Sequence, residues 1–205
     1  TATCTQTITI EDNEAPTISL TCPDDATLNN VCPADIDPSN TGNPTVNVTD
    51  NCAGASQTTT YSDAVTDSTS AGCYVINRTW TVNAVDACGN TSSVSCTQKI
   101  TIEDNEAPVI SLSCPNDTTL HDVCPADVSP ENTGDITLTV TDNCGLAMGS
   151  DTTYVDSIPD ALNEGPGCYV IYRKWTVTAI DPCMNENTAT CTQTITIEDN
   201  EAPTI

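Results

Sequence analysis

The heptapeptide IEDNEAP occurs three times, at residues 10–16, 102–108 and 197–203, and the cysteines between the copies recur in register. Residues 1–18 and 188–205 are identical in sequence. Six cysteines match six others in order: Cys22, Cys32, Cys52, Cys73, Cys88 and Cys96 correspond to Cys114, Cys124, Cys144, Cys168, Cys183 and Cys191. A fixed period of this kind predicts tandem domains, not one large domain.

We therefore expect two complete repeats with their linkers, at residues 17–108 and 109–203. Residues 1–16 are expected to be the last strand of a preceding repeat plus its linker, and residues 204–205 to start a following repeat. The identical ends predict a longer array in which this chain is a window. In that array Cys4 is the sixth cysteine of the preceding repeat.

The composition excludes several kinds of partner. The chain has 29 acidic and 4 basic side chains and a net charge of -25, so nucleic acid is excluded as a partner because phosphate binding requires a basic face. No apolar run approaches the roughly 20 residues of a membrane span. Thirteen cysteines indicate an oxidising compartment, whereas the lack of any CxxC pair and the single histidine argue against zinc.

Strict alternation of apolar and polar residues predicts β-strands. In RTWTVNAVD, the side chains of Arg78, Trp80, Val82 and Ala84 share one face, and RKWTVTAID repeats the pattern from Arg173 onward. No stretch has a helical period. About seven short strands in each repeat predict an all-β fold of tandem immunoglobulin-like β-sandwiches, rich in disulfides.

The topology of such a sandwich also suggests a cysteine pairing. The first and last strands both start at the N-terminal end, which brings Cys22 and Cys96 to the same level of the core. Cys52 and Cys88 follow strands that end at the N-terminal end. This is one of 15 possible connectivities. It pairs Cys22–Cys96, Cys32–Cys73 and Cys52–Cys88 in the first repeat, and Cys114–Cys191, Cys124–Cys168 and Cys144–Cys183 in the second.

Three motifs cover nearly the whole length of a repeat: DNEAPTISLTCPDDATL at 12–28, VTDNC at 48–52 and WTVNAVDACGN at 80–90. Their order resembles the HYR family of immunoglobulin-like extracellular modules. The threonine-rich composition is similar to that of very long tandem surface proteins of Bacteroidetes, including gliding-motility adhesins. This resemblance implies secretion, display at the cell surface, and adhesion or filament formation, without naming a ligand.

The acidic heptapeptide suggests a calcium site, because its side chains offer only oxygen donors, as Ca²⁺ prefers. Two loops are expected to open toward the same end of the repeat. The linker is also similar to the calcium-holding DxNDNxP junction of cadherins; a plain solvated connector is the alternative. The candidate ligands are Glu11, Asp12, Asn13, Glu14, Asp50, Asp86 and Asn90 in the first repeat, and Glu103, Asp104, Asn105, Glu106, Asp142, Asp181 and Asn185 in the second.

Short motifs for glycosylation are also present. NxS/T occurs at Asn47, Asn77 and Asn116, and at Asn90, where it conflicts with the metal role. The Bacteroidetes resemblance implies an O-glycosylation motif, which matches at Ser68, Thr118, Thr152 and Ser157.

The function expected from these patterns is a structural tandem-repeat module of a secreted cell-surface protein, forming a calcium-stiffened stalk or filament for adhesion. Its expected partners are neighbouring repeats of the same chain and other copies in a filament. The alternatives are a glycan- or ligand-binding module, using the variable loop between Cys144 and Cys168, and an accessory domain of a large secreted enzyme. Catalysis is not expected, because no nucleophile elbow is present and His121 is matched by Asn29 in the first repeat.

Overall fold

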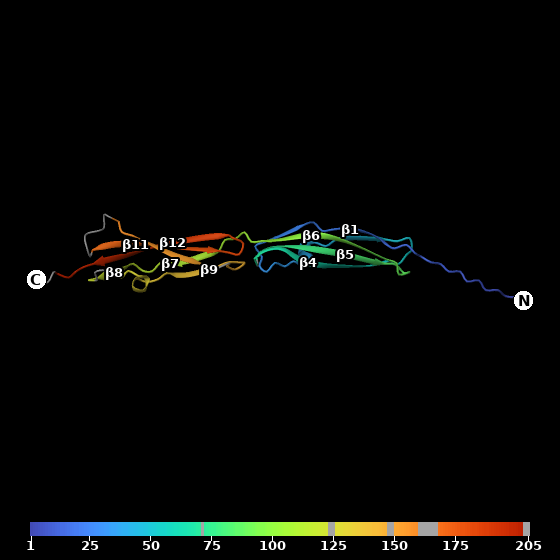
Figure 1. Cartoon of the computed structure of the whole chain (residues 1–205), viewed down its shortest axis with the longest axis horizontal. Helices are drawn as coiled ribbons and strands as arrows, with labels where there is room; N and C mark the ends of the chain where they lie inside the picture. The colour runs from blue at the N-terminus through green and yellow to red at the C-terminus, as the bar shows by residue number, and fades with distance from the viewer. Residues whose placement is uncertain (71, 123–125, 147–149, 160–167, 203–205) are drawn as a thin grey trace. The chain divides into compact units, whose positions relative to one another are not determined.

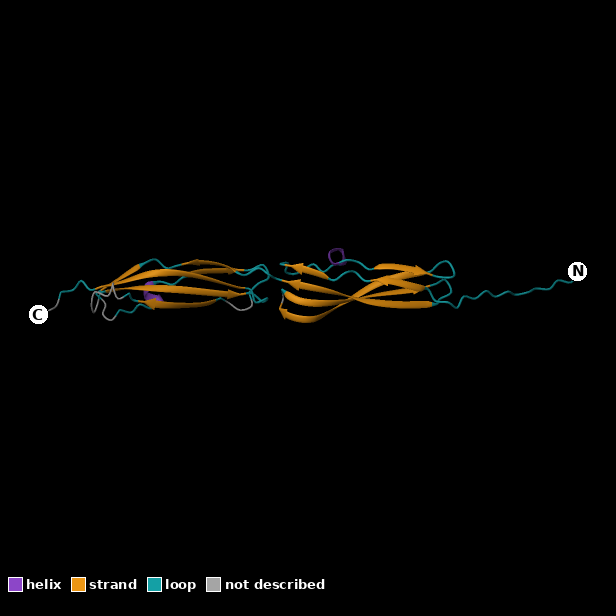
Figure 2. Cartoon of the chain, turned by 90° about the horizontal axis from the view of Figure 1, so that it is seen from above, coloured by secondary structure: helices purple, strands orange, loops and turns teal. Residues whose placement is uncertain are grey.

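The computed structural model divides the chain into two compact units, Thr1–Glu103 and Asp104–Ile205, and each is described here by itself. Figure 1 labels their strands, and Figure 2 shows that strands and loops make up most of each unit. The structure describes residues 1–70, 72–122, 126–146, 150–159 and 168–202.

The first unit is a β-sandwich of two sheets. Strands β1 and β3 form an antiparallel pair, and the second sheet has the order β2-β6-β5-β4, in which β2 and β6 are parallel. The elements are β1 (Thr17–Thr21), β2 (Ala26–Asn29), α1 (Pro38–Thr41), β3 (Thr45–Thr49), β4 (Ser56–Ser70), β5 (Cys73–Val85) and β6 (Thr91–Glu103).

The second unit repeats this arrangement. Its sheets are β7-β9 and β10-β11-β12-β8, and β8 is again parallel to its neighbour β12. The elements are β7 (Val109–Ser113), β8 (Thr118–His121), α2 (Pro130–Thr133), β9 (Thr137–Thr141), β10 (Asp151–Ser157), β11 (Tyr169–Ile180) and β12 (Glu186–Glu198). The predicted all-β, immunoglobulin-like sandwich is therefore confirmed.

Two details differ from the expectation. Each unit has six strands in its described part instead of about seven, and β5 and β6 each run through 13 residues. The division between the units also falls earlier than residue 108, since Asp104 is hydrogen-bonded to Asn143 and Asn185 of the second unit.

The core of each unit lies on the face that the alternation predicted. Trp80, Val82 and Ala84 of β5 are buried, and Ile100 and Ile102 of β6 pack on the same side. The matching residues of β11 and β12 are buried in the second unit. The aromatic content is low and the apolar core correspondingly small, so covalent and polar ties carry a larger share of the stability.

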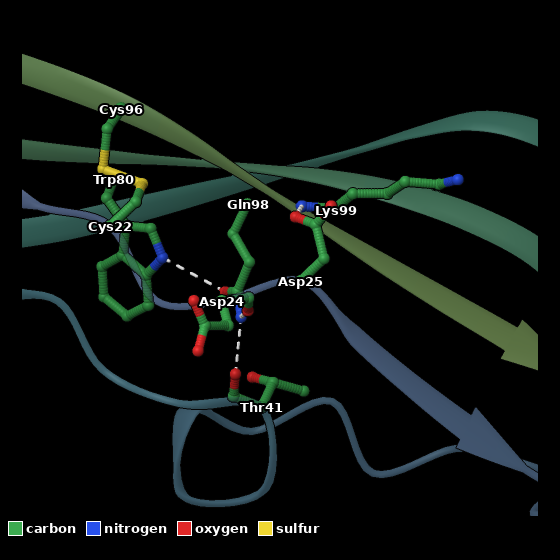
Figure 3. Close-up of a disulfide and its surroundings, with 8 residues drawn as sticks. All are labelled: Cys22, Asp24, Asp25, Thr41, Trp80, Cys96, Gln98 and Lys99. Carbon is green, nitrogen blue, oxygen red and sulfur yellow. Dashed lines mark hydrogen bonds between the residues drawn. A yellow bond between two sulfur atoms is a disulfide. The ribbon is translucent and has the colours of Figure 1, made fainter.

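Figure 3 shows such ties around the Cys22–Cys96 disulfide. The fully buried side chain of Gln98 accepts a hydrogen bond from the Trp80 indole N–H at 3.3 Å. Its amide nitrogen donates to the backbone carbonyl of Thr41, at the end of α1. A single glutamine thus satisfies the buried indole and attaches the α1 segment to the four-stranded sheet.

A buried arginine is the second polar tie. The guanidinium of Arg78 donates from Nε to Asp63 Oδ1 at 2.7 Å, from Nη1 to Thr41 Oγ1 at 2.9 Å, and from Nη2 to the Ile36 carbonyl at 2.8 Å. It also lies 4.3 Å from the ring centroid of Tyr61. The hydrogen-bonded Asp63 carboxylate raises the pKa of Arg78, so the guanidinium stays charged in the core. Arg173 makes the equivalent contacts with Asp156 in the second unit.

The predicted cysteine pairing is confirmed in part. Cys22–Cys96 and Cys114–Cys191 are disulfides, and Cys32, Cys73, Cys144 and Cys183 are also disulfide-bonded. The pair Cys52–Cys88 was wrong: both carry free thiols. Cys168 also carries a free thiol, and its predicted partner Cys124 lies outside the described residues.

Candidate metal centre

Three separate segments bring Asp12, Asp50 and Asp86 together in the first unit. Asp12 lies in the extended segment before β1, whereas Asp50 and Asp86 directly follow β3 and β5. The register of β1 with β3 pairs Thr17 with Thr49, which places the end of β3 beside the entry to β1. One carboxylate oxygen from each of the three aspartates lies within 4.8 Å of the other two.

The second unit builds the same cluster from Asp104, Asp142 and Asp181, again within 4.8 Å. Val109 pairs with Thr141 in the register of β7 with β9, so the geometry arises in the same way. Burial is deeper here: Asp104 is 3% exposed and Asp181 is 0% exposed. Clustered carboxylates at this depth repel one another and lose hydration, a cost that a bound cation would offset.

The two loops orient their carboxylates through Asp-x-Cys turns. The backbone N–H of Cys52 donates to Asp50 Oδ1 at 2.9 Å, and that of Cys88 donates to Asp86 Oδ1 at 2.8 Å. The N–H of Cys144 holds Asp142 Oδ1 in the same way, at 2.8 Å. Each turn therefore occupies one oxygen of its aspartate and directs the other oxygen elsewhere.

Several of these remaining oxygens are buried without a donor. Oδ2 of Asp12 and Asp50, and Oδ2 of Asp104 and Asp142, have no hydrogen-bond partner. No lysine or arginine forms an ion pair with either cluster among the described residues. An anionic oxygen that lacks a hydrogen-bond donor is poorly compensated for its lost hydration, so these four oxygens are the atoms of the clusters most available to bind a cation.

The predicted ligands Asn90 and Asn185 donate hydrogen bonds to the clusters from their amide nitrogens. The Asn90 amide nitrogen donates to the Asp12 carbonyl at 2.9 Å and to Asp86 Oδ2 at 2.7 Å. Asn185 bridges Asp104 and Asp181 in the same way, at 2.8 and 2.6 Å. The hydrogen bond from Asn90 lowers the pKa of Asp86, which keeps that carboxylate ionised.

Sequence reasoning missed Asn51 and Asn143. Their amide nitrogens donate to Oδ1 of Asp12 at 3.3 Å and of Asp104 at 3.0 Å. The recurrence of DNC in both repeats was the available signal. The pKa of Asp12 is lowered chiefly by the Glu14 backbone N–H and further by the Cys52 thiol.

Most of the linker residues predicted as ligands lie outside the carboxylate clusters. Each linker contributes one aspartate, because the backbone N–H two residues later turns back to hold its Oδ1, as Glu14 does for Asp12. The other acidic and amide side chains of the linkers are exposed: Glu11, Asn13, Glu14, Glu103, Asn105 and Glu106.

The chemistry of the clusters fits a hard divalent cation. Calcium binds oxygens at about 2.3–2.6 Å, so two of its ligands lie at most about 5 Å apart, which the 4.8 Å separation satisfies. Three carboxylates supply the anionic charge, and bidentate binding with water or backbone oxygens completes the six to eight ligands that calcium prefers. Thiols and imidazoles contribute nothing to either three-carboxylate cluster, which distinguishes them from zinc sites.

The glycosylation candidates differ in accessibility. Asn47, Asn116, Thr152 and Ser157 are exposed, and Asn77 and Thr118 are half-buried. The side chain of Ser68 lies outside the described residues. The Asn90 amide nitrogen donates hydrogen bonds to Asp12 and Asp86, so the atom that would carry a glycan is already bound within the fold.

Each unit is thus an all-β, immunoglobulin-like sandwich with a three-carboxylate cluster between its leading segment and two loops. No family model matches the chain, and no curated protein matches it, so the HYR resemblance stays a prediction. Within the described ranges, no helix has the length and apolar character needed to cross a bilayer.

The solved structures to which the chain is similar include cadherin repeats. It aligns with Drosophila N-cadherin EC1-4 at 13% identity and a TM-score of 0.32, covering 92% of this chain and 50% of that one. For protocadherin gamma B2 extracellular cadherin domains 1-5 the identity is 11% and the TM-score 0.33, over 94% and 41% of the two chains. The chain spans about half the length of these structures.

Proposed function

We propose that this chain is a structural tandem-repeat segment of a secreted cell-surface adhesion protein, in which calcium stiffens the junction ahead of each repeat. The observation that carries the proposal is the convergence of Asp104, Asp142 and Asp181. Two of these carboxylates are almost fully buried, and no basic side chain of the described residues forms an ion pair with any of them. A divalent ion would remove their mutual repulsion and join the linker to both loops.

Chain connectivity explains why such an ion would stiffen the junction. Strand β6 ends at Glu103, and Asp104 is the next residue. Fixing Asp104 therefore leaves almost no free backbone between the last strand of one repeat and the anchored start of the next. Without the ion, the Asp104 carboxylate is repelled by its neighbours, and the hydrogen bonds from Asn143 and Asn185 remain to hold the linker in place.

The extracellular location rests on the disulfides, since they form and persist in oxidising compartments. In this setting the partners are neighbouring repeats of the same chain and other copies in a filament. The proposal assigns no catalytic role. The only histidine, His121, is exposed, and its Nδ1 lies 3.3 Å from Glu198 Oε2.

Glycan binding has less support as the primary role. A sugar-binding face commonly uses exposed aromatic rings, and Tyr61 and Tyr154 are both partly exposed. Each ring, however, packs against the core tryptophan of its unit: Tyr61 lies 5.1 Å from Trp80, and Tyr154 lies 4.9 Å from Trp175. Both rings also cover a buried arginine, so they serve the fold.

Calcium titration of the whole chain by calorimetry tests the proposal, with Asp142→Asn as the key variant. Asparagine keeps the Oδ1 that accepts the Cys144 N–H and removes only the charge. We expect one binding event to be lost. Glu131→Gln, an exposed acid of α2 in the same unit, is the matched control and should bind normally.

Small-angle scattering with calcium and then with a chelator tests the stiffening. When calcium is removed, we expect the scattering profile to indicate a broader range of maximum dimensions for the chain. We also expect protease cleavage at the linkers to increase. Calorimetric binding that is absent from the unaltered chain, or scattering that does not change on chelation, would refute the calcium-stiffened stalk.

A further inference from the structure

Two cysteines lie against the cluster of the first unit without being part of it. Cys52 follows Asp50 by two residues, and Cys88 follows Asp86 by two. The backbone N–H of each cysteine holds Oδ1 of its aspartate, at 2.9 and 2.8 Å. Any change that moves either cysteine therefore moves a carboxylate of the cluster.

The two cysteine-bearing loops are in contact. A Cβ built on Gly54 would lie 3.7 Å from the Cβ of Ala87, an ordinary van der Waals distance. Gly54 is two residues beyond Cys52, and Ala87 immediately precedes Cys88. This proximity places the two exposed thiols on adjoining loops.

The two units hold these positions in different oxidation states. Cys52 and Cys88 are thiols, whereas their counterparts Cys144 and Cys183 are disulfide-bonded.

We propose that Cys52 and Cys88 are positioning residues of the first cation site, so that closure of a disulfide between them strengthens cation binding and cation binding favours closure. This inference rests on the proposed calcium function. The disulfide restricts the two loops that carry Asp50 and Asp86, whose carboxylates are held by the backbone N–H groups of the same cysteines. Linkage requires the two effects to be equal in size.

The redox step is a thiol–disulfide exchange with a small-molecule disulfide such as glutathione disulfide. The two cysteine thiols lose two protons and two electrons and form one S–S bond. The glutathione disulfide is reduced by the same two electrons and leaves as two molecules of glutathione. The cation is neither oxidised nor reduced.

The experiment equilibrates the whole chain in glutathione redox buffers, with saturating calcium or with a chelator. The thiols are then trapped by alkylation, and the oxidised fraction at Cys52 and Cys88 is measured by peptide mass spectrometry. We expect calcium to increase the equilibrium constant for this disulfide about tenfold, within the usual range of coupling between sites. The Cys22–Cys96 disulfide is the internal control and should not respond.

A second measurement removes the two thiols by conservative substitution, so that the disulfide cannot form. The double variant Cys52→Ser/Cys88→Ser, titrated with calcium by calorimetry, should bind at its first-unit site about tenfold more weakly than the oxidised chain. Two results overturn the inference while the calcium function stands: calcium binds but leaves the thiol–disulfide equilibrium unchanged, or the pair stays reduced in every buffer. Absence of calcium binding overturns both proposals.

Discussion

The side-chain amide of Asn90 donates a 2.9 Å hydrogen bond to the backbone carbonyl of Asp12, across 78 residues of sequence. The same amide donates to Asp86 Oδ2 at 2.7 Å. The leading segment is therefore attached to the loop after β5 by the protein itself. The cation would act on a linker that is already docked, which lowers the ordering cost of binding.

Replacing the equivalent Asn185 with alanine tests this docking in the second unit. The variant loses two hydrogen bonds and leaves the buried Asp181 Oδ2 without a donor. We expect the free energy of unfolding in chelator to fall by about 1–3 kcal/mol, measured by urea denaturation. Asn132→Ala, an exposed asparagine in α2, is the control; an equal loss in both variants would contradict the bridging role.

Replacing the buried Arg173 should lower the free energy of unfolding more than replacing its exposed neighbour Lys174. Arg173→Ala removes a 1% exposed side chain and leaves Asp156, its Thr133 contact and the Val128 carbonyl without their donor. We expect a loss of about 3 kcal/mol in urea denaturation, toward the lower end for a broken buried pair because the Asp156 side chain is 29% exposed. Lys174→Ala, at the next and exposed position, should stay within about 0.5 kcal/mol.

Acid should reduce the contribution of Asp86 to the stability of the fold only at low pH. Hydrogen bonds lower the pKa of Asp86 in the folded protein below its ordinary 3.8. A carboxyl whose folded pKa is lowered stabilises the fold above its ordinary pKa, and this contribution is lost as the pH falls through the lowered value. We expect the stability difference between the chain and Asp86→Asn, in chelator, to be constant from about pH 7 to 5 and to shrink below about pH 4. A difference that declines already between pH 7 and 5 would show that Asp86 titrates elsewhere.

The core disulfide should contribute strongly to stability. Cys114 and Cys191 are separated by 77 residues, and closing a loop of that length in the unfolded chain is worth about 4.5 kcal/mol in the entropic model. Thermal unfolding of Cys114→Ala/Cys191→Ala should show a large fall in Tm. Cys4→Ala removes an exposed free thiol and should leave the Tm unchanged.

The strands and the core face could be read from the sequence because both depend on short-range patterns. Alternation through RTWTVNAVD identified the buried face of β5, including Arg78, and two of the predicted disulfides followed from sandwich topology. The strand count was less accurate, since nothing in a period of two says where a long strand should be divided.

The aspartates of the candidate site could be predicted from the sequence, whereas the roles of its asparagines could not. Repetition of the linker and of the acids after two strands indicated Asp12, Asp50 and Asp86, which the tertiary structure brings within 4.8 Å of one another. The roles of Asn51 and Asn90 depend on which amide nitrogen reaches which oxygen across the fold, and no local pattern encodes that.

The sequence by itself determined the repeat, the all-β class and the oxygen-rich chemistry of the junction, because periodicity and side-chain chemistry are local properties. Only the tertiary structure decided that one aspartate of each linker turns inward while its acidic neighbours face solvent. It also decided that Cys52 and Cys88 remain free thiols. The physical reason is that hydrogen bonds and burial between distant segments depend on ångström-scale placement, which emerges only when the strands are packed.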